Sequence, residues 1–289
     1  MYRPHLVKHL STLKLTKTYL VLSFLYGIST LIVPFATQLL VNDLALTGLW
    51  LNTFTFLFLI GVALAGALII KYFQLLIVEY LQRHLFFREV SAWERKVPHD
   101  EQQSPYFFEV FALLKSFSAI VTDGVDLFLK CFFGAIALAF IHPGFLVISA
   151  LFLGTIVLIR WQGRGAILAS LDESDQKYAI YDGIKEADAS GAIRLMGDYL
   201  RERETQFGFI KRQSLTVFGS YFVLQMLLLA WGIQLVQVNQ LSIGQLVSAE
   251  IIISGIFVNF SLLPKILRSF YDFETSYTKL EMLKTEGAE

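Results

Sequence analysis

The sequence predicts an all-α membrane protein with six transmembrane helices and long helical extensions on the cytoplasmic side. Hydrophobic residues make up 55% of the 289 residues and charged residues only 17%, whereas a soluble domain carries about 25% charged residues. Six apolar segments reach the roughly 20 residues that a helix needs to cross a bilayer. The gaps between them differ so strongly in cation content that they also predict an orientation.

The expected spans follow one another along the chain with short and long connections in alternation. They are residues 19–41, 51–70, 120–141, 144–163, 215–236 and 243–263. Pro34 predicts a kink in the first span, because proline cannot donate the backbone hydrogen bond of a helix interior. The third and fourth spans are joined by His142-Pro143-Gly144, which leaves room only for a tight turn between antiparallel helices.

Lysine and arginine predict that both termini are cytoplasmic. Of the 24 lysine and arginine residues, Lys130 is the only one outside the N-terminal segment, the two long polar segments and the C-terminal tail. The others lie in residues 1–18, 71–119, 160–213 and 264–289. The short connections, residues 42–50, 142–144 and 237–242, contain none. Because cations are retained on the cytoplasmic side, this alternation predicts six spans with both ends inside.

Residues 71–119 and 160–213 are expected to form helices that continue from the spans. Each segment is about 50 residues long, balanced in charge and poor in glycine and proline. With roughly 20 residues on either side of a turn, each pair would extend on the order of 30 Å from the membrane. The residues that flank the two expected turns are Pro98, Pro105, Gly183 and Gly191.

Ionisable groups inside the spans are candidate functional residues, because a charge in a bilayer is costly. Asp126 and Lys130 are four residues apart, which predicts an ion pair on one helix face. Glu250 has no such partner on its own helix, so pairing with another helix or protomer, contact with cargo or an ion, and protonation all remain open. Tyr26 and Gln225 belong to polar stripes, which are typical of helix–helix contacts and, alternatively, of a cavity wall.

The sequence shows no arrangement of nucleophile and base, and no metal-ligand spacing. Cys131, the single cysteine, lies in an apolar stretch and is expected to pack in the core. His5 and His9 are four residues apart, but no acidic or cysteine ligand lies near them. Zero net charge gives no indication of a nucleic-acid partner.

Three stretches, together with this topology, resemble the transmembrane domain of type I ABC exporters. The stretches are Gly191-Ala-Ile-Arg-Leu-Met-Gly, Leu241-Ser-Ile-Gly-Gln-Leu-Val-Ser-Ala-Glu-Ile-Ile and Tyr271-Asp-Phe-Glu-Thr-Ser-Tyr-Thr-Lys-Leu. The resemblance covers roughly residues 5–283 and is nearest to bacterial type-1-secretion and bacteriocin-export subunits. It implies an interfacial elbow helix at residues 1–18, a six-helix membrane domain at 19–270, and a linker to a nucleotide-binding domain at 271–289.

By the same resemblance, the cytoplasmic turns form coupling helices near residues 106–114 and 178–186 that dock on ATPase domains. Their aromatic residues are Tyr106, Phe107, Phe108, Tyr178 and Tyr181. Clustered aromatic side chains at a polar turn suit an interface anchor. Alternatively, they pack between the extended helices themselves.

The chain lacks the motifs of an ATPase. A phosphate-binding loop has the form G-x-x-x-x-G-K-[ST], and the sequence contains no Gly-Lys dipeptide. Leu241-Ser-Ile-Gly-Gln is similar to the ATPase signature LSGGQ but lies at the external start of the sixth span. We therefore expect no enzyme activity, metal or cofactor on this chain, with ATP and Mg²⁺ bound by a separate nucleotide-binding domain.

The expected function is the membrane-spanning subunit of an ATP-driven exporter in the bacterial cytoplasmic membrane. Its expected partners are an ABC nucleotide-binding domain or subunit, a second identical or paralogous protomer, and the lipid bilayer, with a periplasmic adaptor also compatible. Three alternatives stay open: a piece of a longer exporter, an ATPase-free regulatory or scaffold relative, and an ion- or proton-driven carrier that uses Glu250 and Lys130.

Overall fold

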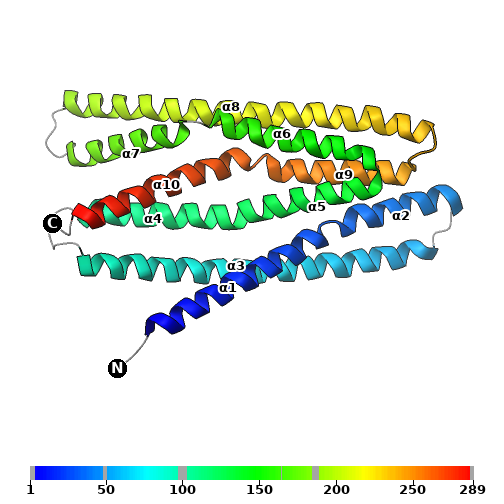
Figure 1. The fold of residues 1–289 in the computed structure, drawn as a ribbon, viewed down its shortest axis with the longest axis horizontal. Coiled ribbons are helices and arrows are strands. Elements are labelled where there is room, and N and C mark those ends of the chain that lie inside the picture. The colour runs from blue at the N-terminus through cyan, green and yellow to red at the C-terminus, as the bar shows by residue number, and fades with distance from the viewer. Residues whose placement is uncertain (1–3, 48–50, 97–102, 164, 184–188, 287–289) are drawn as a thin grey trace. The chain divides into compact units, whose positions relative to one another are not determined.

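The computed structural model describes residues 4–47, 51–96, 103–163, 165–183 and 189–286. Within these ranges the secondary structure is helical, without strands, as the sequence predicts (Figure 1). The α-helices are α1 Pro4–Ser29, α2 Ile32–Thr47, α3 Leu51–Lys96, α4 Gln103–Ala119, α5 Val125–Ile141, α6 Leu146–Gln162, α7 Ala166–Gly183, α8 Ala189–Gln237, α9 Ile243–Phe260 and α10 Leu263–Glu286. A π-helical turn, Ile120–Gly124, joins α4 to α5, and a 3₁₀ turn, Pro143–Phe145, joins α5 to α6.

Six helical stretches are long and apolar enough to cross a membrane, which confirms the prediction of a multi-pass membrane protein. They lie in α1–α2, α3, α4–α5, α6, α8 and α9–α10. In α3, none of the most apolar window is buried within the chain. Large exposed apolar surfaces of this kind are stable in lipid and not in water.

α3 and α8 each contain an apolar half and a more polar half without interruption, with the apolar half first in α3 and last in α8. They contain 46 and 49 residues, which corresponds to about 70 Å of helix each. For these two helices, the expected continuity between span and extension is present. Of the first expected turn, residues 97–102, including Pro98, lie outside the described residues, whereas Pro105 lies in α4.

The first span is broken where proline predicts a kink. α1 ends at Ser29 and α2 begins at Ile32. Pro34 has no N–H to donate to the carbonyl of Thr30, four residues earlier, so one helical hydrogen bond cannot form. Thr30 N–H donates to the Tyr26 carbonyl (3.1 Å) and Leu31 N–H to the Ile28 carbonyl (3.0 Å), which tightens the end of α1.

The interfacial elbow helix expected for residues 1–18 stays a prediction. α1 continues from Pro4 to Ser29 without a break at residue 18. No glycine or proline lies between His5 and Tyr26, so nothing in the local sequence interrupts the backbone hydrogen bonds.

The extension that follows the fourth span is also not continuous with it, in contrast to the expectation. α6 ends at Gln162 and α7 begins at Ala166. Gly165 has a φ of +91°, in the region that residues with a side chain rarely adopt. Gly163 and Gly165 therefore allow α6 to end and the chain to change direction before α7 begins.

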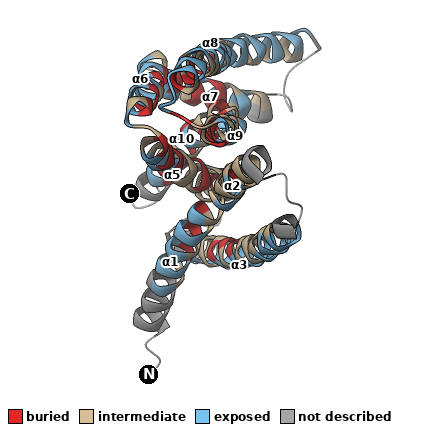
Figure 2. Ribbon diagram, turned by 90° about the vertical axis from the view of Figure 1, so that its right-hand side faces the viewer, coloured by how far each residue is buried: buried red, intermediate tan, exposed pale blue. Residues whose placement is uncertain are grey.

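The chain divides into two compact units, which we describe separately. Unit 1 comprises residues 1–81, 121–155 and 218–262, and unit 2 comprises residues 82–120, 156–217 and 263–289. In unit 1, α9 packs against α2 and α5, and buried residues concentrate on α5 and α9 (Figure 2). The core there includes the fully buried Phe145, Leu228 and Ala249.

In unit 2, α10 packs against α4 and α7.

The start of α9 explains the Ser-Ile-Gly-Gln sequence in structural terms. Ser242 Oγ accepts from the Gln245 backbone N–H (3.1 Å), and Gln245 Oε1 accepts from the Ser242 N–H (2.8 Å), forming a capping box. Gly244 N–H donates to Asn42 Oδ1 on α2 (3.1 Å). A Cβ at Gly244 would lie 2.5 Å from the Gln38 carbonyl oxygen, so only glycine allows this close approach of α2 and α9.

Replacing Ser242 with alanine should destabilise the protein by about 1 kcal/mol, because it removes the capping acceptor of α9. Ser261→Ala is the matched control, since the exposed Ser261 hydroxyl donates to its own helix at Val258. Thermal midpoints in detergent, followed by size-exclusion chromatography, should fall for Ser242→Ala and stay nearly constant for the control. Equal shifts would show that the capping box does not contribute to stability.

Candidate functional site

In unit 1, Lys71 of α3 and Asp126 of α5 form an ion pair. The Lys71 ammonium binds Asp126 Oδ2, and the Asp126 side chain is only 10% exposed. The second carboxylate oxygen, Oδ1, has no hydrogen-bond partner among the described residues. A carboxylate this buried depends on its cation, because desolvation penalises an unpaired charge.

Lys130 does not pair with Asp126, so the expected ion pair on one helix face is wrong. Its ammonium donates to Asn259 Oδ1 on α9 (2.9 Å). The Tyr26 ring of α1 lies beside both lysines, with its centroid 5.2 Å from Lys71 Nζ and 5.3 Å from Lys130 Nζ. The partner of Asp126 is therefore Lys71 of α3, and the partner of Lys130 is the side-chain amide of Asn259 on α9.

The structure thus brings Tyr26, Asp126 and Lys130 together around Lys71, a residue that the sequence reasoning missed. By sequence, Lys71 belongs to the segment 71–119, which is expected to be cytoplasmic. The signal that could have found it is the apolar segment Tyr72–Val78, which follows it directly.

The polar stripe on α1 forms helix–helix contacts. Gln74 of α3 donates to Ser23 Oγ (2.8 Å), and both side chains are fully buried or nearly so. Tyr19 donates to the Val121 carbonyl in the π-helical turn (2.7 Å). These contacts extend the Lys71 cluster along the seam of α1, α3 and α5, and they favour the helix-contact interpretation of this stripe.

Glu250 and Gln225, both predicted as candidate site residues, are in contact. Gln225 Nε2 of α8 donates to Glu250 Oε1 (3.2 Å). Ser254 Oγ, four residues along α9, donates to the same oxygen (2.9 Å). The expectation that Glu250 lacks a partner on its own helix is therefore wrong, because a hydroxyl can satisfy a carboxylate at the spacing of one helical turn. No described cation pairs with it.

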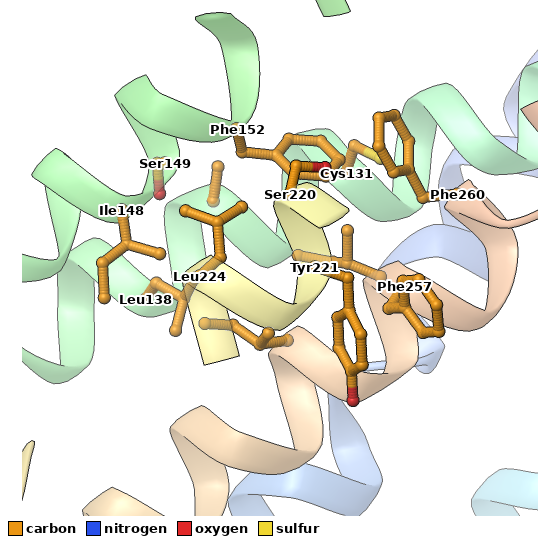
Figure 3. Close-up of a pocket in the computed structure, with 13 residues that line it drawn as sticks. Cys131, Leu138, Ile148, Ser149, Phe152, Ser220, Tyr221, Leu224, Phe257 and Phe260 are labelled. Atoms are coloured by element: carbon orange, nitrogen blue, oxygen red, sulfur yellow. The ribbon is translucent and has the colours of Figure 1, made fainter. Parts of the chain in front are cut away.

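The pockets lined by described residues of unit 1 include the following. One, with a volume of about 30 Å³, is lined by apolar side chains and by Cys131, Ser149, Ser220 and Tyr221 (Figure 3). It confirms that Cys131 packs among core residues. Another, with a volume of about 190 Å³, is lined by the α1–α2 break at Thr30 and Leu31, and by Lys130 and Asn259.

In unit 2, the predicted coupling residues divide into two groups. Tyr106, Phe107 and Tyr181 lie in α4 and α7, but their side chains are outside the described residues. Phe108 is 59% exposed. Tyr178 is half-buried and its hydroxyl donates to Glu109 Oε1 on α4, a contact that favours packing between the extended helices for this residue.

The surroundings of Tyr178 strongly raise the pKa of its hydroxyl. Burial raises the pKa of its hydroxyl, and the hydrogen bond to Glu109 raises that pKa further. Lys279 of α10 lies over the Tyr178 ring, 4.2 Å from its centroid. The tyrosine stays neutral and acts as a hydrogen-bond donor that ties α7 to α4.

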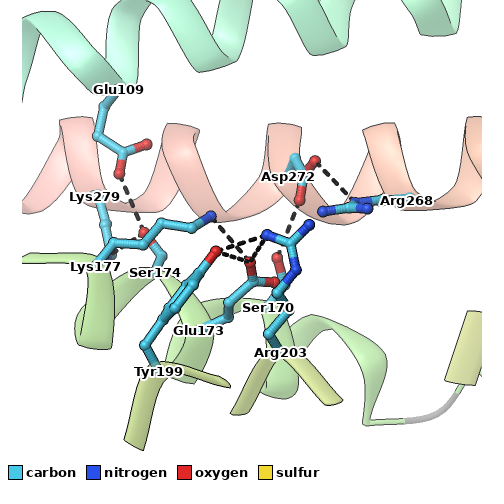
Figure 4. Close-up of polar contacts among 10 residues, drawn as sticks. All are labelled: Glu109, Ser170, Glu173, Ser174, Lys177, Tyr199, Arg203, Arg268, Asp272 and Lys279. Atoms are coloured by element: carbon cyan, nitrogen blue, oxygen red, sulfur yellow. Dashed lines mark hydrogen bonds and ion pairs between the residues drawn. The ribbon is translucent and has the colours of Figure 1, made fainter. Parts of the chain in front are cut away.

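Unit 2 also contains a network of charged residues around the buried Glu173 (Figure 4). Glu173 is almost fully buried and binds Lys177 (3.2 Å) and Arg203 (3.9 Å). Lys279 binds Asp175 (2.7 Å) and donates to Ser174 Oγ (2.8 Å). The sequence reasoning missed this network, although the spacing of Glu173 and Lys177 is that of a helical ion pair.

A larger pocket of about 480 Å³ lies beside this network in unit 2. Its lining includes Lys115, Ser116, Arg268 and Thr275. Arg268 binds Asp272 on the same helix (3.9 Å), and Asp272 accepts from Ser170 of α7 (3.4 Å). No group of three or more His, Cys, Asp or Glu residues in the described part of the chain could hold a metal ion.

Comparison with known proteins adds no assignment. No family model matches the sequence, and no curated protein matches it significantly.

Proposed function

We propose that this protein is the membrane-spanning subunit of an ATP-driven exporter of the type I ABC class. In this proposal it works as a dimer in the bacterial cytoplasmic membrane, with both termini inside. An ABC nucleotide-binding domain or subunit supplies ATP and Mg²⁺ binding. The main support is the uninterrupted course of α3 and α8 between apolar and polar sequence.

A helix of this length can transmit movement only if its polar half is held in a stiff structure. In unit 2, the contacts among α4, α7, α8 and α10 could provide this stiffness. Glu109 and Glu173 are buried acceptors, and each has a partner on a neighbouring helix: Tyr178 of α7 for Glu109 and Arg203 of α8 for Glu173. Satisfied buried networks of this kind favour one defined arrangement of helices. A stiff block attached to long helices suits rigid-body switching.

Phe108 is the best-placed described residue for contact with an ATPase domain. Its ring is exposed on α4, within the range that the exporter resemblance assigns to the first coupling helix. Tyr178 is less suitable for a test, because Tyr178→Asp would also place a second carboxylate beside Glu109 and disturb unit 2.

Phe108→Asp should weaken binding of the partner ATPase by about 2 kcal/mol, or about 30-fold, the size of an interface hot spot. Phe207→Asp is the matched control: Phe207 is equally exposed, at 58% against 59%, but lies on α8 outside both expected coupling turns. The ATPase would be isolated with the wild-type chain in mild detergent, and its affinity and stimulated ATP hydrolysis measured in proteoliposomes.

Several results of this experiment would overturn the proposal or its details. Absence of a stoichiometric ATPase partner would favour the ATPase-free scaffold. Equal loss with Phe108→Asp and Phe207→Asp would show that the docking turn is misplaced. Cargo flux that follows a proton gradient without ATP, and that falls in Glu250→Gln, would favour the ion-driven carrier.

The carrier remains the second candidate because of the surroundings of Glu250. Its carboxylate has two neutral donors, Gln225 and Ser254, inside a stretch apolar enough to cross a membrane. Acidic groups in such positions often exchange protons or bind ions.

A further inference from the structure

The pocket at the α1–α2 break combines one lysine with an otherwise mostly apolar lining. Its volume is about 190 Å³, which corresponds to about six water molecules. Apolar walls come from residues such as Leu31, Val33 and Ile251, and the polar contribution comes mainly from Lys130 and Asn259. The pocket therefore suits a small charged headgroup attached to an apolar body.

The charge of Lys130 is not neutralised by an ion pair. The carboxylate of Asp126 is taken by Lys71, and no carboxylate in the described chain lies within ion-pairing distance of Lys130. Asp123 lies seven residues earlier in the helix, about 10 Å along its axis, and its carboxylate accepts from Thr122. The Lys71–Asp126 pair is neutral as a unit, so Lys130 contributes one net positive charge beside the pocket.

With respect to the described residues, the ammonium of Lys130 uses only part of its hydrogen-bonding capacity. A lysine ammonium offers three donors, and one is used by Asn259 Oδ1. Asn259 is itself fixed, because its amide nitrogen donates to the Gly255 carbonyl (2.8 Å). The amide thus orients the lysine, and the remaining donors are available to a ligand in the pocket.

We propose that this pocket binds the headgroup of an amphiphile with a single negative charge, held by Lys130. A lone cation in a membrane is costly, and one monoanion would neutralise it. A doubly charged phosphate monoester would leave a negative charge without a partner. The statement that such an amphiphile is the cargo rests on the proposed export function. The statement that the pocket binds it does not.

Binding can be measured with radiolabelled decanoate and purified protein in phosphatidylcholine nanodiscs, without nucleotide or ATPase. We expect saturable binding that excess unlabelled decanoate abolishes and that decanol and decyltrimethylammonium leave unchanged. Lys130→Met should weaken binding at least about tenfold, while Lys130→Arg keeps the charge and should retain binding.

A second pair of variants tests the pocket without removing the charge. Gly255 lines the pocket, and a Cβ there would meet no atom within 4 Å, so Gly255→Leu should fill the pocket and abolish binding. Gly154→Leu is the matched control, because Gly154 has equal space but lies on α6 outside the pocket. If Lys130→Met fails to fold, the two glycine variants still decide the question.

Two sources could supply such a monoanion, a free carboxylate amphiphile or a phosphodiester lipid. Adding phosphatidylglycerol to the nanodiscs should reduce decanoate binding if the lipid occupies the pocket, and should leave it unchanged if free carboxylates are preferred. Absence of saturable binding, or equal loss in Gly255→Leu and Gly154→Leu, would overturn the proposal. If no stoichiometric ATPase partner can be isolated with the chain, saturable decanoate binding would still support the site, and only the export function would be overturned.

Discussion

Replacing Lys71 with methionine should destabilise the protein by about 3 kcal/mol, at the lower end of the cost of breaking a buried ion pair. The change leaves Asp126 without its cation in a site where the carboxylate is 10% exposed and one oxygen already lacks a partner. The lower end applies because Lys71 itself is 42% exposed. The measurement is the free energy of unfolding in mixed detergent micelles, supported by thermal midpoints.

The double variant Lys71→Met with Asp126→Asn should recover part of this loss, because no unpaired charge remains. Arg268→Met is the control for removing a cation from an exposed pair. Arg268 and Asp272 are 39% and 38% exposed, and loss of such a pair costs about 0.5 kcal/mol. A double variant as unstable as the sum of the two single variants would show that Lys71 and Asp126 are not energetically coupled.

In unit 2, removing both cations of Glu173 should destabilise the protein by about 3 kcal/mol, far more than removing either one. Lys177 and Arg203 are half exposed, so each can be replaced while the other still neutralises the carboxylate. Lys177→Met and Arg203→Met should therefore each cost about 1 kcal/mol or less. Without both, the Glu173 side chain, which is 2% exposed, keeps among the described residues only the long hydrogen bond from the Tyr199 hydroxyl to its Oε1 (3.4 Å).

Hydrogen exchange of α7 is the most direct measurement, because α7 carries Glu173 and should open more often in the double variant. Adding Glu173→Gln to the double variant should restore part of the protection, since the buried charge is then removed. Additive effects of the two single substitutions would contradict a shared role at one carboxylate. If the export function is correct, the double variant should also lose ATPase stimulation while keeping its six membrane segments.

The sequence determined the features that depend on local chemistry. Hydropathy is a property of consecutive residues, so the apolar stretches and the helical class were predictable from composition and segment length. Pro34 marked the break in the first span because a missing N–H acts within one helical turn. Cys131 was correctly predicted to pack in the core, because an isolated thiol in an apolar stretch behaves as a small hydrophobic group.

Only the tertiary structure decided which polar groups meet. Asp126 binds Lys71, which lies 55 residues away, in preference to Lys130 four residues away. Lys130 bonds to Asn259 at a separation of 129 residues, and Tyr178 to Glu109 at 69. Helical spacing determines which residues share a face, but the partner of a buried charge depends on which faces of different helices come together. That choice follows from the packing of whole helices, which no single segment of the sequence specifies.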